Sequence, residues 1–306
     1  MRRARRPSIT ALRRRFKTKN NYAGGDPPAF FICFAGHQAG LFLPYLYPNM
    51  EYALITGASK GIGRAIAREL ASRGYNILLV ARSEDLLQQL AGEIASRDGV
   101  VTDWLALDLS LPQAAQNVYD WCRAKSYDVS VLVNNAGYGL SGPFEKYPLQ
   151  DHLNMMQLNM STLVSMTRLF LPDLHTRPKA HILNVASSAA YQAVPNLTLY
   201  AATKSFVLAF SRGLHQELHK TAVSVTCVSP GATDTDFPNR AQLGEKGMKA
   251  AEKFNMSPET VAALAVKGML SGKTEVITGF INKLGAAMAW LLPKTVVERT
   301  AMKIYE

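Results

Sequence analysis

The chain has little cysteine and no cluster of metal-binding side chains. Its three cysteines, Cys33, Cys122 and Cys227, form no C-x-x-C pair, and its six histidines have no metal-ligand spacing. This pattern argues against a disulfide framework and against a zinc site. We therefore expect no bound metal and a reducing compartment, with a cytoplasmic location as the simplest expectation.

The basic charge of the chain is unevenly distributed. The formal net charge is +11, but residues 1–49 alone hold nine Lys or Arg and one acid. The remaining chain is close to neutral and has no basic stripe with interleaved aromatic residues. We expect no nucleic-acid partner for this part of the chain.

Residues 1–49 form an extension with a pattern of their own. An Arg-rich run is followed by a Gly/Pro cluster and by an apolar stretch, 29–47, which His, Gln and Pro interrupt. The stretch has about the minimum length for a membrane span. Three interpretations compete. In the first, residues 1–49 result from an upstream start artefact and the protein begins at Met50. In the second they are a targeting segment, and in the third they are a disordered or membrane-touching tail. We favour the first, because Met50 stands just before the first expected strand.

From residue 51 onward, apolar strands alternate with amphipathic helices. The run Asn76–Ala81 is continuously apolar after its first residue, as a sheet buried on both faces requires. This alternation predicts an α/β fold with a doubly wound parallel sheet (Rossmann fold) in a single domain, residues 50–280. The expected strands are 52–56, 76–81, 101–107, 129–133, 180–186, 222–228 and 275–277. Helical spacing marks 62–70, 86–94, 150–177, 198–219 and 257–270.

The C-terminal segment, residues 281–306, is apolar and basic and is expected to be helical. Its run from Leu284 to Tyr305 includes Trp290 and Lys294. The segment packs on the body, closes a substrate cavity or lies on a membrane surface. We favour packing or a cavity-closing role over membrane contact.

A glycine-rich turn links the first expected strand to the first helix. It has the spacing T-G-x-x-x-G-x-G, which is neither G-x-G-x-x-G nor a P-loop. Glycines allow a tight backbone turn close to a pyrophosphate, and the helix N-terminus offers free N–H groups to it. The turn therefore predicts dinucleotide binding. The binding residues expected here are Gly57, Ser59, Lys60, Gly61, Ile62 and Gly63.

The residues at the ends of the second and third strands bear on the choice of nucleotide. An acid after the second strand would accept hydrogen bonds from a ribose 2′-OH, whereas a cation would pair with a 2′-phosphate. Arg82 stands there, with Lys60 on the glycine-rich turn, which favours NADP over NAD, although Glu84 and Asp85 follow closely. Asp108 ends the third strand and either holds the adenine amino group or caps the next segment.

Three further segments carry polar residues at positions where a cofactor would lie. Asn134–Gly137 ends the fourth strand; its asparagines can tie neighbouring loops, and Gly137 allows close approach of the cofactor. Asn159 lies inside the long helix, where Asn is unfavourable; it braces a water behind Lys204 or makes an ordinary buried contact. The sixth strand is followed by a turn placed to cover a nicotinamide. The cofactor-binding residues expected from these loops are Asn135, Ala136, Gly137, Pro230, Gly231 and Thr233.

The most informative spacing joins Ser187, Tyr200 and Lys204. Residues four apart share a helix face, so the Tyr200 phenol and the Lys204 ammonium would project the same way. The ammonium favours the phenolate and lowers the pKa of the phenol toward working pH. Such a phenol can give a proton to a carbonyl oxygen or take one from an alcohol. Ser187 would hold the same oxygen from a strand end.

Taken together, these motifs resemble the short-chain dehydrogenase/reductase family over about residues 50–280. The resemblance rests on T-G-x-x-x-G-x-G, N-N-A-G, the Asn, the Ser, Y-x-x-x-K and P-G in their order and spacing. It implies that Tyr200 is the acid/base and that Lys204 binds the nicotinamide ribose. It also implies that Ser187 polarises the substrate oxygen and that Asn159 holds a proton-relay water. The chain departs from the family pattern at Tyr191, which would crowd or shape the pocket.

The expected reaction is reversible, NADP-dependent reduction of a ketone or aldehyde to an alcohol. The alternative is a non-enzymatic NADP(H)-sensing or scaffold protein on the same fold. The substrate is expected to be a small-molecule, mostly apolar carbonyl or acyl-derived compound, and the resemblance implies a lid over it at 236–256. The proposed pocket residues are Tyr138, Leu140, Tyr191, Val194 and Phe237. The resemblance also implies a homo-oligomer, a dimer or tetramer, and membrane contact is a weak expectation.

Overall fold

A computed structural model describes residues 51–305, without the side chains of residues 239, 250–254 and 304–305. The interpretations of the extension, residues 1–49, and of a start at Met50 lie outside the described residues.

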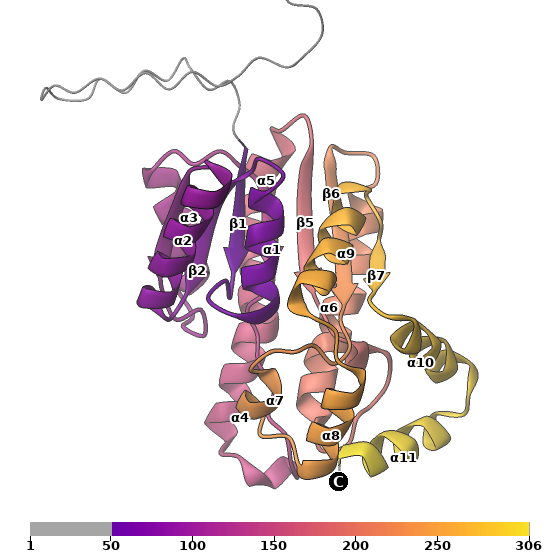
Figure 1. Cartoon of the computed structure of the whole chain (residues 1–306). Coiled ribbons are helices and arrows are strands. Elements are labelled where there is room, and N and C mark those ends of the chain that lie inside the picture. The colour runs from indigo at the N-terminus through magenta and orange to yellow at the C-terminus, as the bar shows by residue number, and fades with distance from the viewer. Residues whose placement is uncertain (1–50, 306) are drawn as a thin grey trace, which may run out of the picture. The chain divides into compact units, whose positions relative to one another are not determined.

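Seven strands form one parallel sheet with the order β3-β2-β1-β4-β5-β6-β7 (Figure 1). All seven expected strands are confirmed, with ends that differ by one residue at most. A continuously apolar strand pairs in parallel only when helices cover both of its faces, which this arrangement provides. The strands are β1 (Tyr52–Thr56), β2 (Asn76–Ala81), β3 (Thr102–Ala106), β4 (Val129–Asn134), β5 (Ala180–Val185), β6 (Val223–Ser229) and β7 (Glu275–Ile277).

Helices cover both faces of the sheet. α1, α2 and α9 pack on one face, and α3, α5 and α6 pack on the other. Near the carboxyl ends of the strands lie α4, α7, α8, α10 and α11 (Figure 1). The helices are α1 (Gly61–Ala71), α2 (Glu84–Asp98), α3 (Ala114–Ala124), α4 (Leu149–Met156), α5 (Thr162–His175), α6 (Thr198–Glu217), α7 (Phe237–Arg240), α8 (Glu245–Phe254), α9 (Pro258–Leu270), α10 (Phe280–Leu291) and α11 (Lys294–Tyr305).

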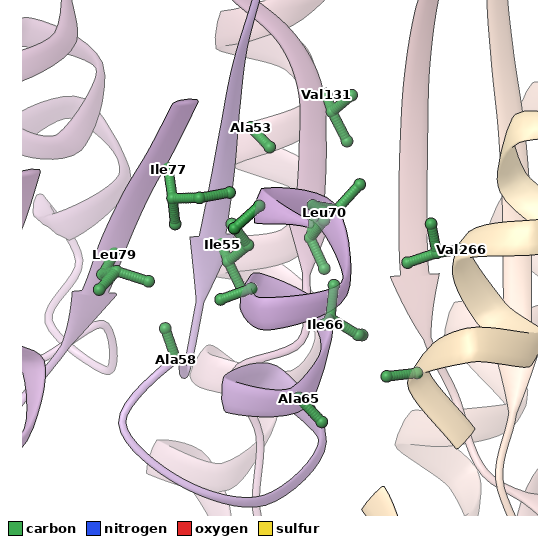
Figure 2. Packing of buried hydrophobic residues seen from close by; sticks show 14 of the residues in the cluster. Ala53, Ile55, Ala58, Ala65, Ile66, Leu70, Ile77, Leu79, Val131 and Val266 are labelled. Carbon is green, nitrogen blue, oxygen red and sulfur yellow. The ribbon is translucent and has the colours of Figure 1, made fainter. Parts of the chain in front are cut away.

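Successive side chains of a strand point to opposite faces of the sheet, so each strand contributes to two separate hydrophobic cores. In β1, Ala53 and Ile55 belong to the core beneath α1 and α9, whereas Leu54 belongs to the core on the opposite face with Phe170. Figure 2 shows the first core, in which Ile66 of α1 lies with the β1 side chains. Full burial of an Ile or Leu side chain stabilises the fold by ~1.5–3 kcal/mol. These two cores fix the helices on the sheet.

The strand order also fixes where a ligand can bind. Chain connections run in opposite directions from β1 to β2 and from β1 to β4, so the sheet has its topological switch point between β1 and β4. In open α/β sheets the ligand crevice lies outside the carboxyl ends of the strands at this point. The glycine-rich turn after β1 and the N-N-A-G segment after β4 therefore meet at the crevice.

The helical zone expected over about 150–177 is present, but its middle is not α-helical. A π-helical turn, Gln157–Ser161, separates α4 from α5. Such a turn inserts one residue into the helical repeat and is frequent at functional sites. Here it directs Asn159 into the protein, where its side chain is buried and fully hydrogen-bonded.

The C-terminal segment is a pair of helices, α10 and α11. α10 contacts the short turn Ser188–Tyr191, and α11 contacts α8. Ala289 and Ala301 are buried, but most large apolar side chains of α10 are exposed. Among residues 51–305, no helix combines the length and the hydropathy needed to cross a bilayer.

Candidate active site

The glycine-rich turn is as tight as its sequence suggests. Gly57 has a φ of +65°, which favours glycine, and a Cβ on Gly63 would lie 2.4 Å from the carbonyl oxygen of Gly57. α1 therefore starts directly against the turn. Lys60 makes no side-chain capping bond to α1, and the first turn of α1 contains no acid. Free N–H groups at a helix N-terminus without a nearby carboxylate suit an anion such as a pyrophosphate.

The loops after β1 and β4 are tied to each other by hydrogen bonds. The Thr56 hydroxyl accepts from the backbone N–H groups of Asn135, at 2.9 Å, and Ala136, at 3.1 Å. The Asn135 amide donates to the carbonyls of Thr56 and Gly57 at 2.9 and 3.1 Å. The prediction that the two asparagines tie neighbouring loops is confirmed for Asn135 only; Asn134 instead donates to the side chains of Thr167 and Asn184. Ser59 and Ile62 complete the turn, and both are half-buried.

Cations line the rim of the crevice in loose ion pairs. Lys60 Nζ lies 3.4 Å from the carboxylate of Asp236, and Arg82 lies 4.0 Å from that of Asp108. All four side chains are largely exposed, so neither pair holds its cation firmly. Arg240 lies over the ring of Tyr138, with its guanidinium carbon 4.9 Å from the ring centroid. The rim thus offers several cations to an anionic ligand.

Asp108 acts as a cap in this structure. Its carboxylate accepts hydrogen bonds from the backbone N–H and the hydroxyl of Ser110, at 2.9 and 2.8 Å. Partial burial raises the pKa of Asp108, but the Ser110 hydrogen bonds and the charge of Arg82 outweigh this effect and hold the pKa below its usual value. Of the two interpretations of Asp108, the cap is the one for which the structure shows hydrogen bonds.

Lys204 is buried at the centre of the candidate site. Its Nζ donates to the carbonyl of Val185 at 2.8 Å and lies 5.9 Å from the ring centroid of Tyr200. Burial lowers the pKa of Lys204 to about 8. At pH 7 the ammonium is therefore still mainly charged, and this charge lies over the ring of Tyr200, one helical turn away.

Asn159 joins this centre through hydrogen bonds. Its amide donates to the Tyr138 carbonyl at 2.9 Å and to the Thr203 hydroxyl at 3.0 Å, and its oxygen accepts from the Tyr138 N–H at 3.1 Å. A Cβ on Gly137 would lie 3.0 Å from Asn159 Oδ1 and 3.4 Å from Lys204 Nζ. Asn159, Gly137 and Lys204 therefore share one small volume.

Ser187 lies at the end of β5, two residues beyond Val185. Its hydroxyl accepts a hydrogen bond from the Ala189 N–H at 3.1 Å, which leaves its own O–H available as a donor. The next residue, Ser188, donates its backbone N–H to the carbonyl of Pro230 at 2.7 Å. Thr233 donates to the carbonyl of Gly231 at 3.1 Å. The P-G turn after β6 is thereby held beside the Ser187 turn.

An apolar cluster surrounds Tyr200, and it corrects one expectation. Four of the five predicted pocket residues belong to this cluster, and Phe237 lies 5.1 Å from the Tyr200 ring, centroid to centroid. Tyr191 instead packs in a separate cluster, and its hydroxyl donates to the carboxylate of Glu275 and is hydrogen-bonded to the hydroxyl of Ser229. Its ring is drawn toward β6 and β7 by these polar partners, so the prediction that it shapes the pocket is wrong.

Two contributors to the site were not found from the sequence. Thr203 bridges Asn159 to α6, and Ala301 of α11 packs in the Tyr200 cluster. Thr203 directly precedes Lys204, so the motif itself could have drawn attention to it. Ala301 carries no sequence signal, because a single alanine in a C-terminal helix has no distinctive pattern.

The switch-point crevice, the uncapped α1 N-terminus and the Tyr200–Lys204 centre define an oxidoreductase of the Rossmann type. The family model described as short chain dehydrogenase matches residues 51–246. The chain belongs to this family.

Several of its relatives share one name. The very-long-chain 3-oxoacyl-CoA reductase of Bos taurus is 34% identical over 274 residues, which are 87% of this chain and 82% of the relative. The enzyme of that name from Anas platyrhynchos is 41% identical over 185 residues, and the match spans only 58% of each chain. A solved short-chain dehydrogenase from Sphingobium yanoikuyae in complex with NADPH has a TM-score of 0.69 and 28% identity, covering 79% of this chain and 94% of that one.

Proposed function

We propose that the chain is an NADPH-dependent reductase that converts the keto group of an apolar 3-oxoacyl thioester into a secondary alcohol. The observation that carries the proposal is the buried ammonium of Lys204, one helical turn from the Tyr200 phenol at the carboxyl ends of β4 and β5. A buried charge is costly to a fold. A role in proton transfer explains why this buried charge lies beside the Tyr200 phenol.

The residues of the site supply the proton and hold the reacting oxygen. Tyr200 donates its phenolic proton to the carbonyl oxygen of the substrate, and Lys204 stabilises the negative charge that develops on the phenol oxygen. Ser187 donates its hydroxyl proton in a hydrogen bond to the same carbonyl oxygen. Asn159 holds the π-helical turn against Thr203 and Tyr138, which keeps α6 and Lys204 in place.

The cofactor would be held by the glycine-rich turn and by the cations of the rim. The uncapped α1 N-terminus fits a pyrophosphate. When bound, the dihydronicotinamide supplies the hydride that reduces the carbonyl carbon. Lys60 and Arg82 are only loosely paired with Asp236 and Asp108, so they are available to a 2′-phosphate. This availability supports NADPH over NADH.

The substrate class rests on two supports. The relatives named above are 3-oxoacyl-CoA reductases. The surroundings of Tyr200 are apolar, with Phe237 from α7 and Val194 among them, and α11 adds Ala301. An acyl chain would exchange water for these side chains, which is favourable in proportion to the apolar area it buries.

A Tyr200→Phe variant tests the proton donor. We expect its turnover of 3-oxoacyl thioesters to fall by roughly 10²–10⁴-fold, the usual size of a general acid's contribution. Its binding of NADPH, followed by nucleotide fluorescence, should be unchanged. Tyr75→Phe, which removes a phenol at the opposite end of the sheet, is the matched control and should retain full activity. Undiminished turnover in Tyr200→Phe would exclude the proposed mechanism.

A Lys60→Ala/Arg82→Ala double variant tests the nucleotide preference. Loss of charge-assisted contacts to a phosphate should weaken NADPH binding by roughly tenfold or more. NADH lacks the 2′-phosphate, so its affinity should stay nearly constant and serves as the internal control. Equal losses for both nucleotides would show that the two cations do not read the phosphate. Nucleotide binding without turnover of any carbonyl substrate would instead favour a sensing or scaffold role.

A further inference from the structure

α10 carries an apolar stripe on the side that faces away from the protein. Phe280, Leu284, Ala287 and Leu291 recur at i, i+4, i+7 and i+11, the spacing of one helix face. Phe280 is 79% exposed and Leu291 67% exposed. Ile281 and Met288 widen the stripe and are also exposed. The buried Ala289 lies on the opposite side of the helix.

This exposure is unusual because the apolar face of α10 is turned to solvent and not to the protein core. An amphipathic helix normally turns such a stripe to the core and its charges to water. Exposed apolar patches of this kind mark surfaces that contact a membrane or a protein. The stripe (Phe280, Ile281, Leu284, Ala287, Met288 and Leu291) is therefore a contact surface.

Basic residues accompany the stripe. Between Phe280 and Lys303 the chain has four basic side chains, Lys283, Lys294, Arg299 and Lys303, and a single acid, Glu298. Trp290, 82% exposed, lies next to Lys283 on the flank of the helix. Of these, Lys283 lies on α10 itself, Lys294 follows its end and donates to the Ala289 carbonyl, and the other two lie on α11. An apolar face flanked by a lysine and an indole, with further cations just beyond the helix, is the pattern of a helix that lies in the headgroup region of a bilayer.

The charge pattern distinguishes between two possible partners of the stripe, a lipid surface and a second copy of the chain. A two-fold contact brings the same patch of both subunits together, so the positive charge around the stripe would face itself. The surface of an anionic bilayer is complementary to that charge. We propose that α10 docks this protein onto anionic membrane surfaces, with the stripe inserted among the acyl chains.

The position of α10 links this surface to the candidate site. α10 contacts the turn that follows Ser187, and α11 runs from its end to α8 (Figure 1). Docking through α10 would therefore place α11, whose Ala301 packs in the Tyr200 cluster, near the bilayer. The docking itself requires neither substrate nor cofactor, so it can be measured independently of the proposed reaction.

The test uses the full chain and vesicles of phosphatidylcholine with or without phosphatidylserine. We expect binding to the anionic vesicles and quenching of the indole fluorescence by lipids brominated in their acyl chains. The chain has three tryptophans, and none lies in residues 1–49, so this quenching does not report the extension. Replacing Trp290 with Phe should remove most of the quenching and leave vesicle binding in place.

The decisive variant is Phe280→Ser/Leu284→Ser/Leu291→Ser. It should lower both vesicle binding and Trp290 quenching at least about tenfold. The matched control, Val101→Ser/Leu111→Ser/Leu149→Ser, removes three exposed apolar side chains elsewhere and should behave like the wild type. Unchanged Trp290 quenching in the stripe variant would overturn the proposal. So would a wild-type dimer that the stripe variant dissociates, with no vesicle binding by either.

Discussion

Replacing Lys204 by Met should stabilise the protein while it abolishes carbonyl reduction. Burial lowers the pKa of Lys204 from an ordinary value of 10.5 to about 8. One pKa unit corresponds to ~1.4 kcal/mol, so keeping this ammonium charged in the fold costs ~3 kcal/mol at neutral pH. The variant also loses the hydrogen bond to the Val185 carbonyl, which contributes ~1 kcal/mol. The net gain is ~2 kcal/mol.

The pH dependence of this gain distinguishes a buried charge from simple repacking. Below pH 8 the lysine is protonated in both the folded and the unfolded state, and the full cost applies. As the pH rises from about 8 to 10.5, the folded lysine loses its proton first and the cost disappears. At pH 9.5 the remaining cost is ~1.4 kcal/mol, so the advantage of Lys204→Met should nearly vanish.

Thermal unfolding without nucleotide, at pH 7 and at pH 9.5, measures this effect. At pH 7 the variant should melt ~5 °C above the wild type, because 1 kcal/mol shifts the melting temperature of a domain of this size by ~2–4 °C. Lys267→Met, on an exposed position of α9, is the matched control and should show no pH-dependent gain. A Lys204→Met protein that is less stable at pH 7, or a gain independent of pH, would refute the reasoning.

Two further predictions concern the fold around the site. Burial lowers the pKa of His181 on β5 to about 4, so the free energy of unfolding falls by ~3 kcal/mol as the pH drops from 6.5 toward 4. Urea unfolding of His181→Gln should show a smaller fall over this pH range. An equal fall in the variant and the wild type would contradict this. Gly63→Ala places a Cβ against the Gly57 carbonyl and should cost at least ~2 kcal/mol and weaken NADPH binding. Gly92→Ala, which has open space around it, is the control and should be neutral or stabilising. If Gly63→Ala were tolerated equally well, the tight turn would be disproved.

Much of this architecture follows from local patterns. Continuous apolar runs such as Asn76–Ala81 require cover on both faces, and glycine at positions 57 and 63 is needed where a strand turns directly into a helix. The spacing of Tyr200 and Lys204 puts both on one helix face by geometry alone. The seven strands and the tight turn after β1 follow from these local rules, whereas the strand order that sets the switch point is a property of the tertiary structure.

Other features depend on contacts between segments that lie far apart in the sequence. Asn159 enters a π-helical turn because Tyr138 and Thr203 satisfy its amide, and Tyr191 leaves the pocket because Ser229 and Glu275 bind its hydroxyl. Helical periodicity predicts that Phe280, Leu284 and Leu291 share a face but not what covers that face. Only the packing of α10 on the body, through Ala289, decided that this apolar face points outward.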